Sequence, residues 1–466
     1  MRRTTVLLGI MLSVPSLACT RTESADLAIT NVTVIDVTGA RAPSSATVLI
    51  TGTRISKIDR SRRTKLADGV QVIDGTGKFV IPGLWDMHMH MSSKQYLALF
   101  VANGVTSIRV MAAFKGESEL RDEVSAGRLT GPRMTVASPV AYGREPGWTG
   151  SFGAITNEEE GRQLVRKAKN DGADFVKVDS YLPRNAYFAI VDEAKKQGIP
   201  VAGHVPYSVN GAEVSDAGQR SIEHKYGVII PCSKREEAIG KTFMEELIPT
   251  PVARVRLLAA IDYSEEKAAT LFARFVKNRT FVCPTLVVWS ELSLRDRADL
   301  SKDPRLRFMM PDRSDGWIRQ SSQLADAEAL ADLRTLQRKA LDIVRAMAHA
   351  GVELLAGTDT PMPYCYPGFG LHDELALFVQ AGLSPMEALR TATYNPAKFL
   401  GKLDSMGTVE EGKVADLVML DANPLEDIRN TRKIAAVVVG GKILQRAELA
   451  KMLAEVEAAT DKSKKK

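Results

Sequence analysis

The stretch Pro82-Gly83-Leu84-Trp85-Asp86-Met87-His88-Met89-His90 decides the fold and gives the first indication of chemistry. It starts as an apolar strand and ends in two histidines separated by one residue. Alternate residues of a strand point to the same side, so both imidazoles can enter one space at the strand end. Because imidazole is the commonest metal ligand, His88 and His90 predict a metal site. A His-x-His pair alone is a weak signal, and the surrounding sequence strengthens it.

Seven further apolar runs follow this one, and helical patterns separate most of them. They are VTSIRVM (105–111), RMTVASP (133–139), FVKVDS (175–180), PVAGHV (200–205), SIEHKYG (221–227), TFVCPTLVV (280–288) and ELLAGTDT (353–360). Strands that alternate with helices indicate βα units and a parallel sheet. Eight such strands predict an α/β fold with a closed (β/α)8 TIM barrel over residues 81–400. One expected helix covers 324–350 and ends at Gly351.

Both ends of the chain are instead rich in β-strand patterns. The runs are 27–37, 46–58 and 70–82 near the start, and 415–423 and 434–444 near the end. Gly and Asp-Gly turns between them are typical of antiparallel hairpins. We therefore expect a small composite β-sandwich domain from residues 27–80 and 401–446. Residues 447–466 are expected to form a packing helix and a basic tail.

Two long connections interrupt the predicted barrel, at residues 232–279 and 289–322. Their mixed charged and apolar content predicts helical insertions over the barrel mouth. A lid and simple decoration are both open interpretations.

The composition is that of a globular protein, with 466 residues, 45% hydrophobic and 25% charged. The formal net charge of +6 is modest and partly terminal. No basic stripe with interleaved aromatic residues occurs, which argues against a nucleic-acid partner.

The N-terminus resembles an export signal. Arg2 and Arg3 precede an apolar stretch, 6–14, that is too short to span a bilayer, and Ser16-Leu17-Ala18 is a small-residue cleavage site. We therefore expect a signal peptide at 1–18 and a tether at 19–26. Cys19 resembles the cysteine of a bacterial lipoprotein box, so a lipid tether to the membrane and simple secretion into the periplasm are the two alternatives.

Apart from Cys19, the chain has three cysteines: Cys232, Cys283 and Cys365. An odd number allows at most one intramolecular bridge. A Cys232–Cys283 disulfide and free buried thiols both stay open, because sequence does not define the geometry.

Four of the six histidines lie at or just past predicted strand ends, since His204 and His224 join His88 and His90 there. In a βα barrel this rim carries the active site. Asp359 follows the last strand, where a carboxylate can bind a metal and accept a proton; a helix N-cap is the alternative.

Lys177 lies inside an apolar strand, and burying an ammonium group is costly. One interpretation is a lysine that reaches solvent or pairs with a carboxylate such as Asp179. The other is that burial lowers its pKa so that the neutral amine adds carbon dioxide. The resulting carbamate could bridge two cations.

Five motifs together resemble those of the amidohydrolase superfamily: PGLWDMHMH (82–90), FVKV (175–178), GHVP (203–206), SIEH (221–224) and GTDT (357–360). Segments 371–401 and 411–425 are similar to it as well. The resemblance covers residues 27–444 and is greatest to the imidazolonepropionase-like and prolidase-like group. One departure is that Arg109 is followed by Val110, where family members often carry an aspartate.

The resemblance implies two divalent ions. His88, His90 and Asp359 would hold one, His204 and His224 the other, with carboxylated Lys177 and a hydroxide between them. Zinc suits a histidine-rich site, and cobalt, manganese and iron stay open.

The resemblance also implies hydrolysis of a C–N bond in a dipeptide or an N-acyl amino acid, a small-molecule substrate. Hydroxide would attack the carbonyl, with Asp359 as general base and then acid. Cyclic amides, lactones or esters are the alternative substrates. A non-catalytic barrel that only binds ligands is a distant alternative, because all six ligand positions are present. Whether the chain forms a homo-oligomer stays open.

Candidate substrate contacts lie on the same rim: Tyr142, Arg144, Tyr207, Tyr226 and His372. Arg144 could clamp a carboxylate or lie in solvent. Tyr226 resembles a position at which prolidase-like relatives bind the substrate carboxylate. His372 could cap a helix or touch substrate.

Overall fold

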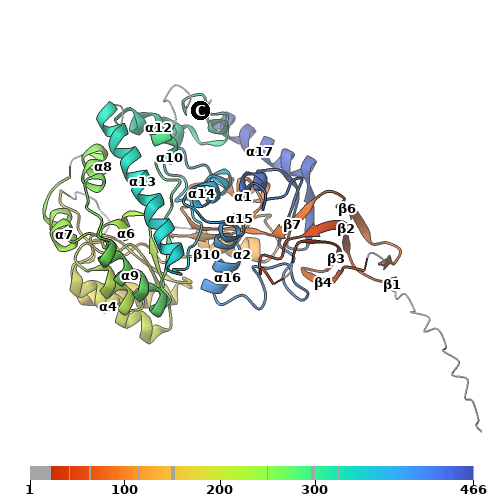
Figure 1. The fold of residues 1–466 in the computed structure, drawn as a ribbon, viewed down its shortest axis with the longest axis horizontal. Coiled ribbons are helices and arrows are strands. Elements are labelled where there is room, and N and C mark those ends of the chain that lie inside the picture. The colour runs from red at the N-terminus through yellow and green to blue at the C-terminus, as the bar shows by residue number, and fades with distance from the viewer. Residues whose placement is uncertain are drawn as a thin grey trace, which may run out of the picture.

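The computed structural model describes residues 22–40, 42–61, 64–113, 116–147, 153–248, 250–294, 300–323 and 326–464. The predicted signal peptide and Cys19 lie outside these residues, so export and lipidation stay predictions. The strands of the two chain ends gather on one side of the molecule, and the helical part extends on the other (Figure 1). No helix in the described ranges is both long enough and apolar enough to cross a bilayer.

A single mixed sheet joins the two ends of the chain. Its strand order is β17-β16-β15-β7-β2-β3-β4, with β6 paired to β2. The bounds are β2 Leu27–Val34, β3 Ser44–Thr51, β4 Arg54–Asp59, β6 Gln71–Asp74, β7 Phe79–Pro82, β15 Leu417–Leu420, β16 Ile434–Val439 and β17 Lys442–Gln445. A separate pair, β1 (Thr22–Glu23) and β5 (Lys65–Leu66), lies beside it. The β-sandwich expected here is therefore not established, because these strands form one hydrogen-bonded sheet.

The hairpin prediction is wrong for two strands of this sheet. β2, β3 and β4 pair antiparallel as expected, but β6 and β7 both pair with β2 in parallel. β7 also pairs antiparallel with β15. The Gly-rich turn at 75–77 thus connects β6 and β7, which both pair with β2. Side chains of β2 form part of the core of this sheet.

The run through Val80 to His88 is divided between two sheets. β7 ends at Pro82, and β8 (Leu84–Met89) starts a parallel sheet. At Gly83, an added Cβ atom would lie 2.0 Å from Thr106 Oγ1. Only glycine lets the chain pass this close to its neighbour, so Gly83 fixes where β8 begins.

The middle of the chain forms two parallel sheets. One has the order β10-β9-β8 and the other β11-β12-β13-β14. The remaining bounds are β9 Val105–Val110, β10 Arg133–Val136, β11 Val176–Val178, β12 Val201–Gly203, β13 Ser221–Glu223 and β14 Phe281–Cys283. The predicted eighth strand makes only isolated parallel bridges, Leu354 to Val282 and Thr360 to Met89. Among the described residues the parallel α/β arrangement is present, but no continuous sheet closes a barrel.

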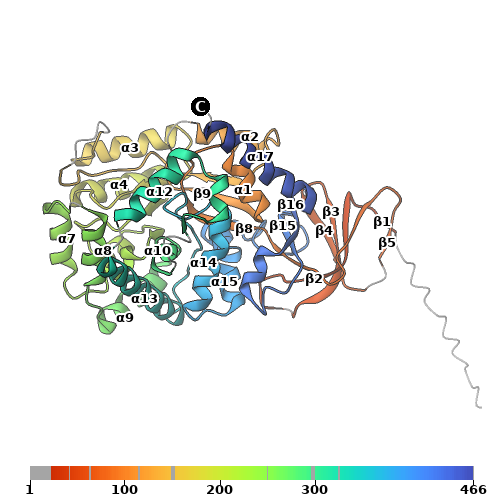
Figure 2. The ribbon, with the colours of Figure 1, turned by 90° about the horizontal axis from the view of Figure 1, so that it is seen from above.

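Helices enclose these parallel strands (Figure 2). They include α1 Tyr96–Ala102, α2 Glu117–Ser125, α3 Glu158–Asn170, α4 Arg184–Gln197, α5 Gly211–Asp216, α6 Tyr226–Ile229, α13 Ala327–His349, α14 Phe369–Gln380, α15 Pro385–Thr391 and α16 Tyr394–Phe399. The expected helix over 324–350 is α13. Asp326 caps its start by accepting a hydrogen bond from the Ala329 amide, and Gly351 follows its end with φ of 82°.

Both insertions are helical, as predicted. The first contains α7 Glu236–Glu245, α8 Pro251–Ala259 and α9 Glu265–Asn278, and the second contains α10 Ser290–Leu294, η1 Pro304–Phe308 and α12 Pro311–Gln323. Helix α8 packs on α13. The C-terminal segment forms η2 (Ile428–Arg432) before the last strands and α17 (Arg446–Lys464) after them, and α17 packs on α1.

Candidate metal centre

Four histidines meet where the parallel strands end. His88 belongs to β8, His204 follows β12 and His224 follows β13. The ring centroids of His88 and His224 are 4.5 Å apart, those of His204 and His224 4.8 Å, and those of His88 and His90 5.4 Å. Because parallel strands end on the same side, residues far apart in sequence converge there.

Asp359 lies among three of these rings. Its Oδ1 is 3.0 Å from His90 Nε2 and 3.4 Å from His88 Nε2, and its Oδ2 is 3.6 Å from His224 Nδ1. Burial alone would raise the pKa of this carboxyl group, but the neighbouring histidines hold the pKa well below its usual range. Asp359 is therefore a carboxylate, the form that binds cations and accepts protons.

His88 is oriented by a buried carboxylate. Its Nδ1 lies 2.7 Å from Glu223 Oε2, and both side chains are fully buried. Because a carboxylate accepts, Nδ1 carries the proton and Nε2 presents its lone pair. That Nε2 is buried and has no hydrogen-bond partner among the described residues. A buried polar atom without a partner is costly, and a cation at this position would satisfy it.

Sequence reasoning missed the support behind His88. The fully buried Arg109 donates from Nη2 to Glu223 Oε1 at 2.8 Å and from Nη1 to Ser221 Oγ at 2.9 Å. Burial would raise the pKa of Glu223, but the charge of Arg109 and the hydrogen bond from His88 keep the pKa below its usual value. The sequence did contain a signal for this contact: Arg109 lies inside an apolar strand, where a buried charge needs a partner.

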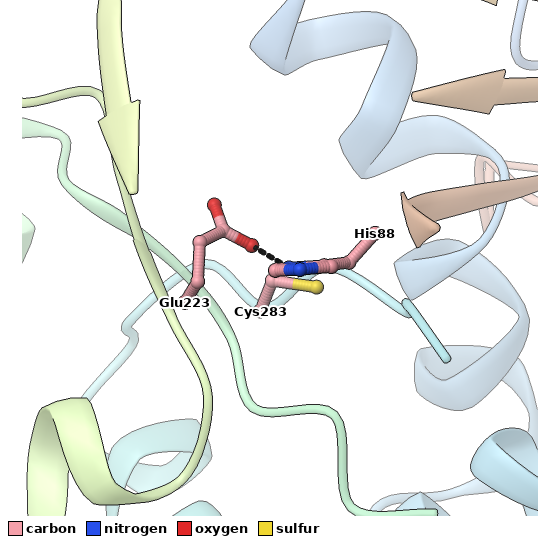
Figure 3. Close-up of side chains that lie close together, drawn as sticks. All are labelled: His88, Glu223 and Cys283. Carbon is pink, nitrogen blue, oxygen red and sulfur yellow. Dashed lines mark hydrogen bonds and ion pairs between the residues drawn. The ribbon is translucent and has the colours of Figure 1, made fainter. Parts of the chain in front are cut away.

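Cys283 lies beside His88 and Glu223 and offers an alternative ligand group (Figure 3). Two features disfavour it. Burial raises the pKa of its thiol, whereas a metal requires the thiolate. Glu223 is also already bonded to Arg109 and His88. The group of His88, His90 and Asp359 therefore fits a cation better. Cys232, Cys283 and Cys365 are all free and buried, so the disulfide considered from sequence is absent.

A second pair of ring nitrogens faces the same space. His204 Nε2 and His224 Nε2 are 3.0 Å apart. His204 Nδ1 lies 3.1 Å from Asp179 Oδ2 and 2.8 Å from Ser180 Oγ, while His224 Nδ1 lies 3.0 Å from Thr285 Oγ1. Burial lowers the pKa of both rings below the usual value of histidine. Protein groups hold the Nδ1 atoms of both rings, and the two Nε2 atoms face each other. The two imidazoles are therefore suited to bind one cation together.

Lys177 is buried in β11, with 2% of its surface exposed. Burial lowers the pKa of its ammonium, against the charges of Glu223 and Asp359. In the described part of the chain no carboxylate forms a salt bridge with it, and Asp179 pairs with His204 instead. The Lys177–Asp179 pair considered from sequence is therefore absent. Lys177 pairs with Ala202 of the neighbouring strand β12, two residues before His204.

Comparison with known proteins decides the family. Residues 79–444 match the Amidohydrolase family, which is most of the chain. This chain belongs to the amidohydrolase family. As an amidohydrolase, it is a hydrolase that acts on carbon–nitrogen bonds.

Solved structures and a curated protein are similar to this chain over most of its length. The amidohydrolase is 25% identical to the structure of a putative prolidase from Bifidobacterium longum, with a TM-score of 0.68 over 92% of this chain and 98% of that one. It is 23% identical to the bottromycin amidohydrolase structure, with a TM-score of 0.70 over 93% and 90% of the two chains. Ochratoxinase from Aspergillus niger is 23% identical over 434 residues, covering 78% of this chain and 75% of that protein.

A cavity of 150 Å³ opens beside the cluster of the amidohydrolase. Its lining is partly aromatic and reaches two cluster residues; it consists of Tyr207, His224, Lys225, Tyr226, Arg254, Leu258, Thr285, Val288, Trp289, Asp359 and Met362. Two of the predicted substrate contacts, Tyr207 and Tyr226, are among them. The Tyr226 ring stacks on His224 at 5.0 Å between centroids.

Three predicted contacts do not line this cavity. Tyr142 and Arg144 are exposed and absent from its lining. His372 is buried on α14, with Nδ1 3.0 Å from Thr431 Oγ1 and Nε2 3.1 Å from the Asn103 carbonyl oxygen. Both ring nitrogens are thus engaged, and His372 is a structural residue that ties α14 to neighbouring segments.

The insertions contribute cavity residues that sequence reasoning missed. Arg254 comes from α8 and Trp289 from the start of the second insertion. Nothing in the local pattern of either segment distinguishes these side chains from surface residues. Only their packing over the strand ends places them in the cavity.

Proposed function

We propose that the amidohydrolase uses two divalent metal ions to hydrolyse the C–N bond of a dipeptide, an N-acyl amino acid or a related small amide. One observation carries this proposal: ring nitrogens of four histidines lie close to the carboxylate of Asp359. Among the described residues the buried His88 Nε2 has no hydrogen-bond partner, and Asp359 Oδ1 lies 3.4 Å from it. Such a donor set suits zinc and related ions.

The residues divide into two groups. His88, His90 and Asp359 would hold one ion, and His204 with His224 the other. Lys177, buried and with a lowered pKa, would carry a carbamate between them. Divalent ions at these positions would polarise the scissile carbonyl and lower the pKa of a water molecule.

The protein's own groups would move the protons. Asp359 is ionised and lines the cavity, so it can take a proton from the attacking water and pass it to the departing nitrogen. Glu223 and Asp179 would keep His88 and His204 as Nδ1–H tautomers, which leaves the Nε2 lone pairs for the ions.

We also propose that the two parallel sheets are parts of one distorted (β/α)8 barrel. The parallel bridge Ala137–Phe175 links β10 to β11, Val282–Leu354 links β14 to the next segment, and Met89–Thr360 links that segment back to β8. The sequence of neighbouring strands that starts at β8 thus leads back to β8, as a closed barrel requires.

Metal depletion and reconstitution test the proposal. Purified protein is stripped with a chelator, reloaded with zinc, cobalt or manganese, and assayed against dipeptides, N-acyl amino acids, cyclic ureides and lactones. We expect amide hydrolysis that depends on about two ions per chain. Full activity of the metal-free protein would overturn the metal centre, and activity confined to lactones would overturn the substrate class.

A further inference from the structure

The cavity beside the cluster holds two cationic side chains, and they differ in how they are used. Lys225 is buried, and its Nζ donates to the carbonyl oxygens of Val288 and Leu286 and to Gln337 Oε1. Its hydrogen-bond donors thus hold the loop that follows β14 in place. Arg254 is the other cation, and its side chain is 34% exposed.

Arg254 is held in place from outside the cavity. Its Nη2 donates to Glu145 Oε1 at 2.9 Å and to the Tyr181 hydroxyl at 2.8 Å. Neither Glu145 nor Tyr181 lines the cavity. The Nε and Nη1 donors of Arg254 have no partner in the part of the chain that the structure describes. A guanidinium that is positioned by one nitrogen and keeps other donors available is suited to bind an anionic ligand group.

The other residues that line the cavity indicate which chemical group would be attached to the anionic group of the ligand. Tyr207, Tyr226 and Trp289 provide aromatic surface, and Leu258, Val288 and Met362 provide apolar surface. The volume of 150 Å³ is below the range of about 300 Å³ and more found for drug-sized ligands. The cavity therefore suits a small group with an apolar side chain and one negative charge.

We propose that Arg254 binds the free carboxylate of the substrate, and that the substrates are therefore amides whose cavity-bound portion is an apolar amino acid with an unblocked carboxylate. This rests on the proposed function, since His224 and Asp359 line the same cavity and would face the scissile bond. It assigns to the insertion helix α8 the role first considered for Arg144, which is exposed and outside the lining.

A matched pair of ligands tests the assignment independently of turnover. N-acetylphenylalanine and its carboxamide differ only in the charge at the carboxyl group. Isothermal titration uses the metal-loaded Asp359→Asn variant, which should hydrolyse these ligands too slowly to disturb the measurement, and every comparison is made in this background. It is expected to show that the carboxylate binds about tenfold to hundredfold more tightly than the carboxamide, the size of a hydrogen bond to a charged group. In Arg254→Gln this preference should disappear, while carboxamide binding stays unchanged.

Arg256→Gln is the control, because Arg256 lies on the same helix, pairs with Glu328 and Asp332, and does not line the cavity. It should keep the preference of the unaltered protein. Equal binding of both ligands, or an unchanged preference in Arg254→Gln, overturns the assignment. Kinetics add a second readout: Arg254→Gln should raise KM for the carboxylate substrate with little change in kcat.

The two proposals fail in different ways. If the metal-loaded protein hydrolyses no amide yet binds the carboxylate through Arg254, the proposed reaction fails and the binding assignment stands. If it hydrolyses carboxamide and carboxylate substrates equally well, the reaction stands and the Arg254 assignment fails.

Discussion

His88 Nδ1 and Glu223 Oε2 lie 2.7 Å apart, and this contact fixes which nitrogen of His88 faces the cluster. We expect Glu223→Gln to lower metal affinity and turnover by about 10- to 100-fold, as loss of a carboxylate behind a ligating histidine usually does. Metal content and kcat report the effect, and Glu266→Gln, an exposed glutamate on α9, is the control. A folded variant with unchanged metal content would contradict the role.

Asp359→Asn tests the proton transfer. The amide keeps the size of the side chain but cannot accept the proton, so turnover should fall by about 10²- to 10⁴-fold. The variant should retain at least one metal ion, because the four histidines are unchanged. Elemental analysis beside a rate measurement checks both points, and near-normal turnover would refute this role of Asp359.

Lys177→Ala tests the bridging carbamate. Removing the amine should lower the metal content and abolish most activity, and small carboxylic acids in the buffer should restore part of both. In the unaltered protein, labelling with ¹³C-bicarbonate should give a carbamate resonance that the variant lacks. A variant with full metal content and activity would show that Lys177 has no part in the centre.

His372 predicts a pH dependence of stability. Burial lowers its pKa to about 3, from an ordinary value of 6.5. Between these values the unfolded chain binds a proton that the folded protein does not, so the free energy of unfolding falls as the pH drops through this window. His372→Asn cannot take up that proton. Its stability difference from the unaltered protein, measured by denaturant titration, should therefore shrink from pH 7 to pH 4; a constant difference would contradict the assignment.

Gly357→Ala tests the packing behind the cluster. An added Cβ atom would lie 2.5 Å from Cys283 Sγ and 2.7 Å from the His88 backbone nitrogen. We expect a loss of about 1–3 kcal/mol in the free energy of unfolding, as overpacking of a core usually produces. Gly153→Ala is the control, since nothing lies within 4 Å of its added atom. Equal melting temperatures of the two variants would argue against this tight contact.

The sequence alone determined the parts of this protein that follow from short-range periodicity. His88 lies in β8 and His90 directly follows it, and the two share one side because side chains alternate along a strand. His204 and His224 join them because each directly follows a parallel strand. The same periodicity predicted α13, whose apolar residues recur at helical spacing.

Only the tertiary structure decided the features that depend on packing between distant segments. Arg254 and Trp289 reach the cavity because the insertions lie over the strand ends. His372 is removed from the substrate candidates because Thr431 and Asn103 engage both of its nitrogens. Local sequence shows the period of a strand or a helix. It carries no signal for which side chains meet when elements that are tens to hundreds of residues apart pack together.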